Sequence, residues 1–337
     1  MRVPFTDAVE LVSAARHGRA GQLSRERRPT VARTSVRVHR GGVDHDQHEK
    51  IARGKGFFAA LDQSGGSTPK ALQQYGVGED QYADEEQMFD LVHTMRTRIM
   101  TSSAFTGDKI LAAILFEQTM DRDVDGMPTA TYLWRHKHIV PVLKTDQGLA
   151  DEARGVQLMK PVQGLPALLG RAVDKGIFGT KMRSVVKHAD EAGIAAVVDQ
   201  QMTYARQVID HDLVPILEPE VDITSPDKGR CEDLLRAHLT AGLDDLPTAA
   251  QVMLKISIPD VDGFYRDLMD HPRMLRVVAL SGGYPRDEAD ERLRRNPGLI
   301  ASFSRALEEG LSVSQSDEEF TATLRRSVDE IYAASVA

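Results

Sequence analysis

The sequence predicts an α/β protein that folds as a single (β/α)8 barrel, and three observations lead to this prediction. Short apolar runs of strand length alternate with longer stretches of helical period from about residue 54 onward. The apolar runs contain few polar residues, which is typical of parallel strands that are buried on both faces. About eight such runs fit into some 280 residues, a length that suits one closed barrel.

The eight runs follow one another along the chain. They are residues 56–61 (GFFAAL), 109–116 (KILAAILF), 139–143 (IVPVL), 177–182 (IFGTKM), 214–217 (VPIL), 252–258 (VMLKISI), 275–280 (LRVVAL) and 299–303 (LIASF). Between them lie helical patterns such as 84–102 and 188–211, in which apolar residues recur every three or four positions. Strand-like runs that alternate with helical ones indicate βαβ units and a parallel sheet.

An open, doubly wound sheet is the competing architecture. It would carry a G-x-G-x-x-G turn after its first strand. Here the only similar stretch is GKGFFA at residues 54–59, which breaks that pattern, and the sequence holds no G-x-x-x-x-G-K-S/T loop. The closed barrel is therefore the better prediction.

Residues 1–48 are predicted to form an extension outside the barrel, which then covers residues 49–337. The first 40 residues hold nine arginines, no lysine and three acidic residues. Such a segment buries too little apolar surface to fold by itself, so we expect disorder. We favour an extension without a role in the fold, with a transit peptide and a basic interaction arm as alternatives.

The composition indicates an ordinary globular protein, with 41% apolar and 27% charged residues. No apolar run reaches the roughly 18 residues of a membrane span. The net charge of −8 argues against a generic nucleic-acid binder. Cys231 is the only cysteine, which excludes an intrachain disulfide and fits a reducing compartment. We expect a cytoplasmic protein without membrane or nucleic-acid partners, and homo-oligomer formation remains open.

Charged side chains follow or interrupt several of the apolar runs. They are Asp62 after the first run, Lys144 after the third, Lys181 and Arg183 at the fourth, Glu218 and Glu220 after the fifth, and Lys255 within the sixth. In a (β/α)8 barrel the functional groups gather at the carboxyl ends of the strands. Residues two apart in a strand share a face. We therefore expect these side chains to meet at one mouth of the barrel.

Lys255 is the most informative of them, because its ammonium group interrupts the apolar run VMLKISI. Burial disfavours a charged amine and is expected to lower its pKa. A neutral lysine amine attacks carbonyl carbon and forms a Schiff base. A structural lysine that pairs with a carboxylate or reaches solvent is the alternative. The expected neighbours Asp62, Lys181 and Glu218 favour catalysis.

The last two runs predict an anion site. Ser281-Gly282-Gly283 exposes backbone N–H groups after the seventh run, and Ser302 and Arg305 add a hydroxyl and a guanidinium at the eighth. Barrels frequently bind phosphate in the loops after strands 7 and 8.

Metal binding is not predicted. None of the histidines lies at the carboxyl end of a run, and the pair His136 and His138 precedes the third run. That position belongs to the opposite end of the barrel. We expect neither a metal nor another cofactor.

The residues discussed above belong to eight segments: 54–67 (GKGFFAALDQSGGS), 114–121 (ILFEQTMD), 140–148 (VPVLKTDQG), 178–183 (FGTKMR), 214–221 (VPILEPEV), 252–258 (VMLKISI), 280–283 (LSGG) and 301–307 (ASFSRAL). Together these segments resemble the class I fructose-1,6-bisphosphate aldolases of the bacterial type, over about residues 48–336. The resemblance implies a TIM barrel. It also implies metal-independent, reversible cleavage of a sugar bisphosphate, fructose 1,6-bisphosphate, to dihydroxyacetone phosphate and glyceraldehyde 3-phosphate in glycolysis or gluconeogenesis.

The resemblance also implies a role for each residue. Lys255 would form the Schiff base, Glu218 would act as general acid and base with Glu220 beside it, and Asp62 would handle the proton of the C4 hydroxyl. Lys181 would assist loss of water from the carbinolamine. The far phosphate would be bound by Lys144 and Arg183, and the near phosphate by Ser281, Gly282, Ser302 and Arg305. Another Schiff-base (β/α)8 aldolase or a transaldolase, acting on a singly phosphorylated sugar, is the alternative.

Three positions depart from the animal members of that family. Gln63 stands where they have an acid beside the catalytic aspartate, and Gln147 replaces a second lysine after Lys144. The tail with a terminal tyrosine has no counterpart, so Tyr332 or water would take over its proton transfer.

Overall fold

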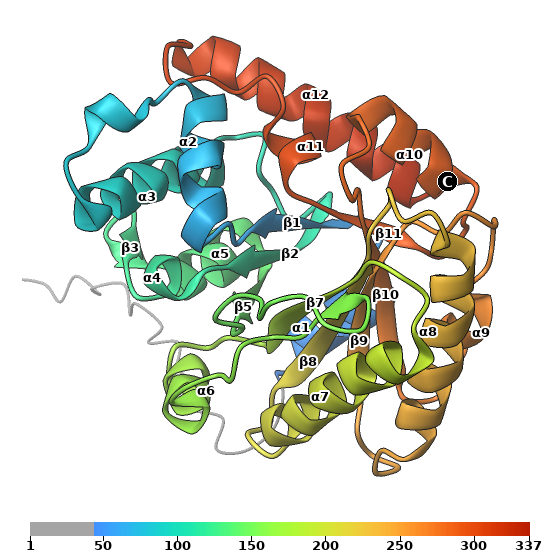
Figure 1. Cartoon of the computed structure of the whole chain (residues 1–337). Coiled ribbons are helices and arrows are strands. Elements are labelled where there is room, and N and C mark those ends of the chain that lie inside the picture. Colours follow the sequence, from blue (N-terminus) through green and yellow to red (C-terminus); the bar gives the residue numbers. More distant parts are fainter. Residues whose placement is uncertain (1–43) are drawn as a thin grey trace, which may run out of the picture. The chain divides into compact units, whose positions relative to one another are not determined.

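Eight parallel strands close into a barrel in the computed structural model, which describes residues 44–337 (Figure 1). In chain order they are β1 (Phe57–Leu61), β2 (Ile110–Leu115), β5 (Val140–Lys144), β7 (Gly179–Val186), β8 (Val214–Val221), β9 (Val252–Ser257), β10 (Met274–Leu280) and β11 (Ile300–Phe303). Each pairs in parallel with the next, and β11 pairs with β1 to close the ring. The predicted (β/α)8 fold is confirmed.

Two strands continue well past the carboxyl ends of the apolar runs that predicted them. β7 continues to Val186 and β8 to Val221, and their register pairs Arg183 with Glu218 and Val185 with Glu220. The two glutamates therefore lie within β8, whereas the sequence placed them after its end. Strand pairing depends on backbone hydrogen bonds, so polar side chains that find partners do not end a strand.

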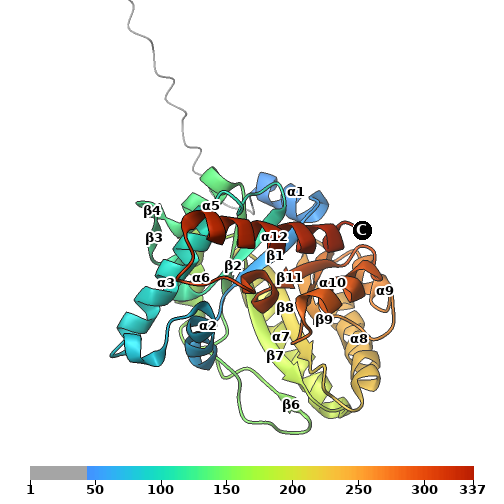
Figure 2. The same cartoon turned by 90° about the horizontal axis from the view of Figure 1, so that it is seen from above.

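Helices surround the barrel. The longer ones are α3 (Glu85–Thr101), α5 (Thr129–Lys137), α6 (Leu165–Asp174), α7 (Glu191–Ile209), α8 (Lys228–Asp244), α10 (Arg286–Arg294) and α12 (Asp317–Ser335); the shorter ones are α2 (Thr68–Tyr75), α4 (Glu117–Met120), α9 (Arg266–Met269) and α11 (Arg305–Glu308). Figure 2 shows α12 along the outside of the barrel, where it contacts β1 and β11. The predicted 188–211 helix begins at Glu191, because the Asp190 side chain accepts a hydrogen bond from the Gly193 N–H and caps it.

Short elements complete the chain. A two-residue strand, β6 (Val156–Gln157), pairs antiparallel with β7 in the long connection between β5 and β7. The strands β3 (Asp123–Val124) and β4 (Met127–Pro128) form a small hairpin before α5. The 3-10 turns η1 (Gly65–Ser67) and η2 (Glu79–Gln81) flank α2.

Helix α1 (His45–Arg53) packs against the amino ends of the strands. Its Ile51 is fully buried among side chains of the barrel interior. Arg276, near the start of β10, donates hydrogen bonds to the carbonyl oxygens of Ile51, Ala52 and Gly54. Residues 45–48 therefore belong to a helix and not to the predicted 1–48 extension, because Asp44 caps the helix start. The rest of that extension, residues 1–43, lies outside the described residues.

The barrel interior changes from apolar to charged toward the carboxyl ends of the strands. Toward the amino ends of the strands, the interior is filled by the inward-facing side chains of Phe58, Ala60, Val142, Ile216, Met253, Val278 and Ile300. They form a core cluster separate from the larger apolar core between the strands and the surrounding helices. Two residues further along the same strands stand Asp62, Lys144, Glu218, Lys255 and Ser302. Since side chains alternate along a strand, these residues point into the same interior.

Candidate active site

The charged residues predicted at the barrel mouth line one cavity of about 520 Å³. Its lining includes Asp62, Lys144, Asp146, Lys181, Arg183, Glu218, Lys255, Arg305 and Glu308. The structure therefore brings together seven of the predicted residues: Asp62 directly after β1, five from β5, β7, β8 and β9, and Arg305 from α11. Glu220 is not among the lining residues.

Lys181 is the central cation of this cavity. Its Nζ lies 2.7 Å from Asp62 Oδ2 and 2.8 Å from Glu218 Oε2, and its side chain is only 3% exposed. Burial by itself would lower the pKa of Lys181, but the charges of Asp62 and Glu218 outweigh it and raise this pKa well above its ordinary value. Lys181 is therefore an ammonium ion that holds two carboxylates in place.

Glu218 joins the two catalytic lysine candidates. Its Oε1 lies 2.9 Å from Lys255 Nζ, and its Oε2 faces Lys181. Burial acts to raise the pKa values of Glu218 and Asp62, but Lys181 and Lys255 lower both overall. Both groups are thus carboxylates at neutral pH, and Glu218 is placed to accept a proton from Lys255.

Asp146 is a member of the cavity that the sequence analysis did not select. Its Oδ1 lies 2.7 Å from Lys144 Nζ, its Oδ2 accepts a hydrogen bond from the Arg183 N–H, and the same oxygen is 3.9 Å from Lys181 Nζ. Its place two residues after β5 was the available signal, because it lies just past the carboxyl end of a strand. Lys144 is consequently held by a carboxylate of its own loop.

Arg183 pairs with Glu220 at the edge of the cavity, with 2.5 Å between Arg183 Nε and Glu220 Oε2. Burial acts against the charge of Arg183, but Glu220 raises its pKa overall. Both predicted phosphate ligands of β5 and β7 are therefore cations that each contact a carboxylate.

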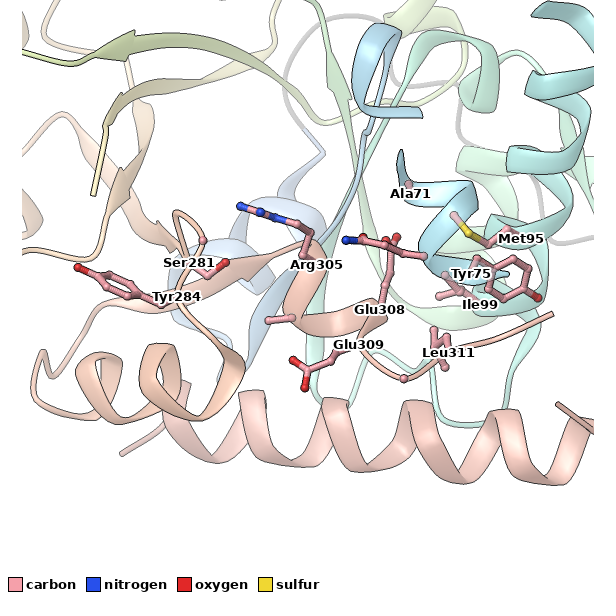
Figure 3. A pocket seen from close by; sticks show the side chains of 14 residues that line it. Ala71, Tyr75, Met95, Ile99, Ser281, Tyr284, Arg305, Glu308, Glu309 and Leu311 are labelled. Carbon is pink, nitrogen blue, oxygen red and sulfur yellow. The ribbon is translucent and has the colours of Figure 1, made fainter. Parts of the chain in front are cut away.

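The predicted anion loop lies beside this cavity. Ser281 and Gly283 line a neighbouring cavity together with Arg305, which lines both cavities (Figure 3). Gly282 has φ +63°, and a Cβ there would stand 2.5 Å from a side-chain carbon of Ile223, so the loop requires glycine. The buried Ser302 Oγ makes no hydrogen bond within residues 44–337. Ser281, Gly283 and Arg305 thus converge, with Ser302 on the inward face of β11.

Tyr332 and the histidine pair lie elsewhere. The Tyr332 ring centroid is 5.8 Å from Lys109 Nζ, immediately before β2, so Tyr332 lies near the amino ends of the strands and far from Lys255. His136 stacks on Tyr132. Within residues 44–337 no three or more histidine, cysteine or acidic side chains are grouped as metal ligands. The helices of this part of the chain are too short or too polar to cross a membrane.

Comparison with known proteins decides the family. The family model of fructose-bisphosphate aldolase class-I matches residues 45–249, more than half of the chain. The chain belongs to this family. It is 57% identical to the fructose-bisphosphate aldolase class 1 of Synechocystis over 87% of this chain and 98% of that protein. The corresponding protein of Porphyromonas gingivalis is 55% identical over 87% of this chain and all of its own length.

A solved structure supports the fold of this class I aldolase. The fructose-bisphosphate aldolase from Plasmodium falciparum, crystallised with TRAP and a small molecule inhibitor, superposes with a TM-score of 0.66. The match covers 88% of this chain and 96% of that chain at 21% identity. At this identity the match concerns the barrel alone.

The class I aldolase carries a second polar cluster at the cavity wall that the sequence analysis missed. Gln63 Nε2 donates to Ser304 Oγ at 2.6 Å and to Glu308 Oε2 at 2.7 Å. Arg96, fully buried in α3, donates to the Gln63 carbonyl oxygen at 2.6 Å. Burial raises the pKa of Glu308 to about 7, against the opposing effects of Gln63 and Arg96. Glu308 ends the short helix α11 and does not directly follow a strand, so no pattern in the sequence marked it.

Glu308→Gln is expected to flatten the pH dependence of stability where Glu308 titrates. An unfolded glutamate has a pKa of about 4.3, so the folded chain holds this proton more tightly. The contribution of Glu308 to the free energy of unfolding is therefore full below about pH 4.3 and is lost as the pH rises through about 7. Urea unfolding from about pH 5 to 8 should show the wild type losing stability relative to the variant; parallel curves would contradict this.

Proposed function

We propose that this class I aldolase cleaves fructose 1,6-bisphosphate reversibly into dihydroxyacetone phosphate and glyceraldehyde 3-phosphate, with Lys255 as the Schiff-base lysine. The observation that carries the assignment is the contact of 2.9 Å between Lys255 Nζ and Glu218 Oε1, inside a cavity that also holds Lys181 and Asp62. Amine nucleophile, proton acceptor and fixed cation are the groups that imine chemistry needs.

Schiff-base formation starts with transfer of the Lys255 proton to Glu218. The neutral amine then attacks the C2 carbonyl carbon of the ketose and forms a carbinolamine. The carbinolamine oxygen takes up a proton from Glu218 and leaves as water, while the Lys181 ammonium stabilises the charge that develops on it. The resulting protonated imine withdraws electrons from C3.

Carbon–carbon cleavage then needs a base at the C4 hydroxyl. Burial acts to raise the pKa of Asp62, but Lys181 and Lys255 lower it overall. Asp62 is therefore a carboxylate that can accept this proton. As the O–H bond breaks, the C4 carbonyl forms and the C3–C4 electron pair moves into the imine, which becomes an enamine. Glyceraldehyde 3-phosphate leaves, and the enamine is protonated at C3 and hydrolysed to dihydroxyacetone phosphate.

The two phosphates are assigned to opposite edges of the mouth. The backbone of Ser281, Gly282 and Gly283, with Ser302 and Arg305, would bind the phosphate near C1. Lys144 and Arg183 would bind the phosphate on C6. Because Asp146 and Glu220 already contact these two cations, the C6 phosphate has to share them.

The family and the chemistry support a proposal for the cellular setting. We propose a role in glycolysis or gluconeogenesis in the cytoplasm, without a metal or another cofactor. The single cysteine suits a reducing compartment.

Borohydride reduction in the presence of dihydroxyacetone phosphate and EDTA is expected to fix the substrate carbons to Lys255 alone. Peptide mass spectrometry should find the added mass on the β9 peptide and none on Lys181. Lys228 provides an internal comparison, since it is equally buried but pairs with Glu232 outside the cavity. Label on any lysine other than Lys255, or no label, would refute the assignment.

A further inference from the structure

Glu308 stands on the wall between two cavities. One is the catalytic cavity, and the other has a volume of about 380 Å³. In Figure 3, Arg305 and Glu308 lie between Ser281 with Tyr284 on one side and Ala71, Tyr75 and Met95 on the other. The second cavity is also lined by the exposed Glu309 and Gly310, so it connects Glu308 with solvent.

The contacts of this carboxyl group fix one oxygen and leave the other free. Oε2 accepts the hydrogen bond from Gln63, whereas Oε1 is buried and has no hydrogen-bond partner within residues 44–337. Gln63 is itself held by Arg96 and Ser304. A buried carboxyl oxygen without a donor is favoured in the protonated form, because it then needs no compensating charge.

Burial favours the neutral acid form of Glu308 against most of its polar and charged neighbours. Burial raises its pKa to about 7, Gln63 and Arg96 lower it, and Asp62 raises it. The other ionisable groups lining the two cavities near it are Arg305 and Glu309 from its own segment, Lys70 and Tyr75 from α2, and Tyr284 across the second cavity. Asp62 and Glu218, by contrast, have lowered pKa values and are carboxylates in the resting site.

We propose that Glu308 donates the proton that converts the enamine on Lys255 into the imine of dihydroxyacetone phosphate, a role that rests on the proposed Schiff-base function. The O–H bond of the Glu308 carboxyl breaks and a C–H bond forms at C3 of the bound fragment. The enamine electron pair supplies the new bond, the nitrogen becomes the protonated imine, and Glu308 is left as a carboxylate. Water from the second cavity then returns a proton to it. In the synthetic direction Glu308 removes the same proton.

Tyr332 was named from the sequence as the side chain that could transfer this proton. Tyr332 lies at the opposite end of the barrel. This leaves water or an acid of the mouth for the step. Glu308 combines a position in the lining of the Lys255 cavity with a route to solvent.

The test isolates the proton step from carbon–carbon cleavage. Dihydroxyacetone phosphate alone is incubated with enzyme in D2O, and deuterium uptake at its hydroxymethyl carbon is followed by NMR. Rates are divided by the number of sites that borohydride traps on Lys255. A positioned acid typically contributes about 10²- to 10⁴-fold. Glu308→Gln should therefore exchange deuterium at least about 100-fold more slowly than the wild type, with trapping on Lys255 unchanged. The adjacent exposed carboxylate provides the matched control: Glu309→Gln should exchange like the wild type.

A second variant distinguishes proton donation from a purely structural role. Glu308→Ala should also lose exchange, and added acetate should restore part of it per trapped site. Wild-type exchange in Glu308→Gln, loss of trapping together with exchange, or failure of acetate to restore exchange would overturn the proposal. A wild-type enzyme that neither traps nor exchanges would instead refute the Schiff-base function itself.

Discussion

Lys255→Met is expected to lower kcat/KM for fructose 1,6-bisphosphate cleavage by about 10⁴-fold or more, because loss of the nucleophile costs a covalent enzyme up to about 10⁶-fold in kcat. Methionine fills the space of the lysine stem but cannot form an imine. Glu218 keeps its contact of 2.8 Å with Lys181, so the carboxylate remains paired. A coupled assay of triose phosphate release, corrected for the folded fraction, measures the loss.

Lys228→Met is the matched control for this variant. Lys228 is as buried as Lys255, with 2.6 Å between its Nζ and Glu232 Oε1 and 3.0 Å to Asp260 Oδ1, yet it lies outside the catalytic cavity. Its loss should cost stability, about 3 to 5 kcal/mol for one partner of a buried ion pair, and leave kcat within a few-fold of wild type. Equal loss of activity in the two variants would mean that burial of a charge, and not its chemistry, explains the effect.

The barrel was predictable because its strands are buried on both sides. Runs such as 109–116 and 252–258 carry apolar residues on both faces, as is typical of parallel sheets covered by helices. The position of Lys255 within such a run also marked it, since an ammonium group is costly there. These signals are local in the chain and therefore visible in a single sequence.

The partners of the catalytic groups were not predictable in the same way. Gln63 and Glu308 form one hydrogen bond across 245 positions of the sequence. Asp146 contacts Lys144 and the backbone of Arg183, and the second contact exists only because β5 and β7 are neighbours in the ring. Glu220, which was predicted from its spacing to share the face of Glu218, pairs with Arg183 and is not among the lining residues of the cavity. Such contacts depend on the closed barrel, which local patterns do not encode.

Lys181→Met is expected to lower activity and stability together. The variant leaves Asp62 and Glu218 as buried carboxylates with Lys255 as their main remaining cation, and removing one partner of a buried ion pair costs about 3 to 5 kcal/mol. The lowered pKa values of both carboxyls mean that their pairing stabilises the folded chain above about pH 4, the pKa range of unfolded carboxyl groups. The difference in free energy of unfolding between wild type and variant should thus be largest at neutral pH and shrink below about pH 4. Urea unfolding at several pH values measures it.

A second substitution separates the electrostatic cost from the loss of catalysis. Asp62→Asn in the Lys181→Met background removes one of the two carboxylates that have lost Lys181, so it should restore part of the lost stability. It cannot restore activity, because Asp62 is the proposed base at the C4 hydroxyl. In the wild-type background the same substitution should destabilise, since it removes the closest carboxylate of Lys181 and leaves Glu218 at 2.8 Å and Asp146 at 3.9 Å. If Asp62→Asn destabilises both backgrounds equally, the two residues are not coupled and Lys181 does not hold the carboxylates of the site together.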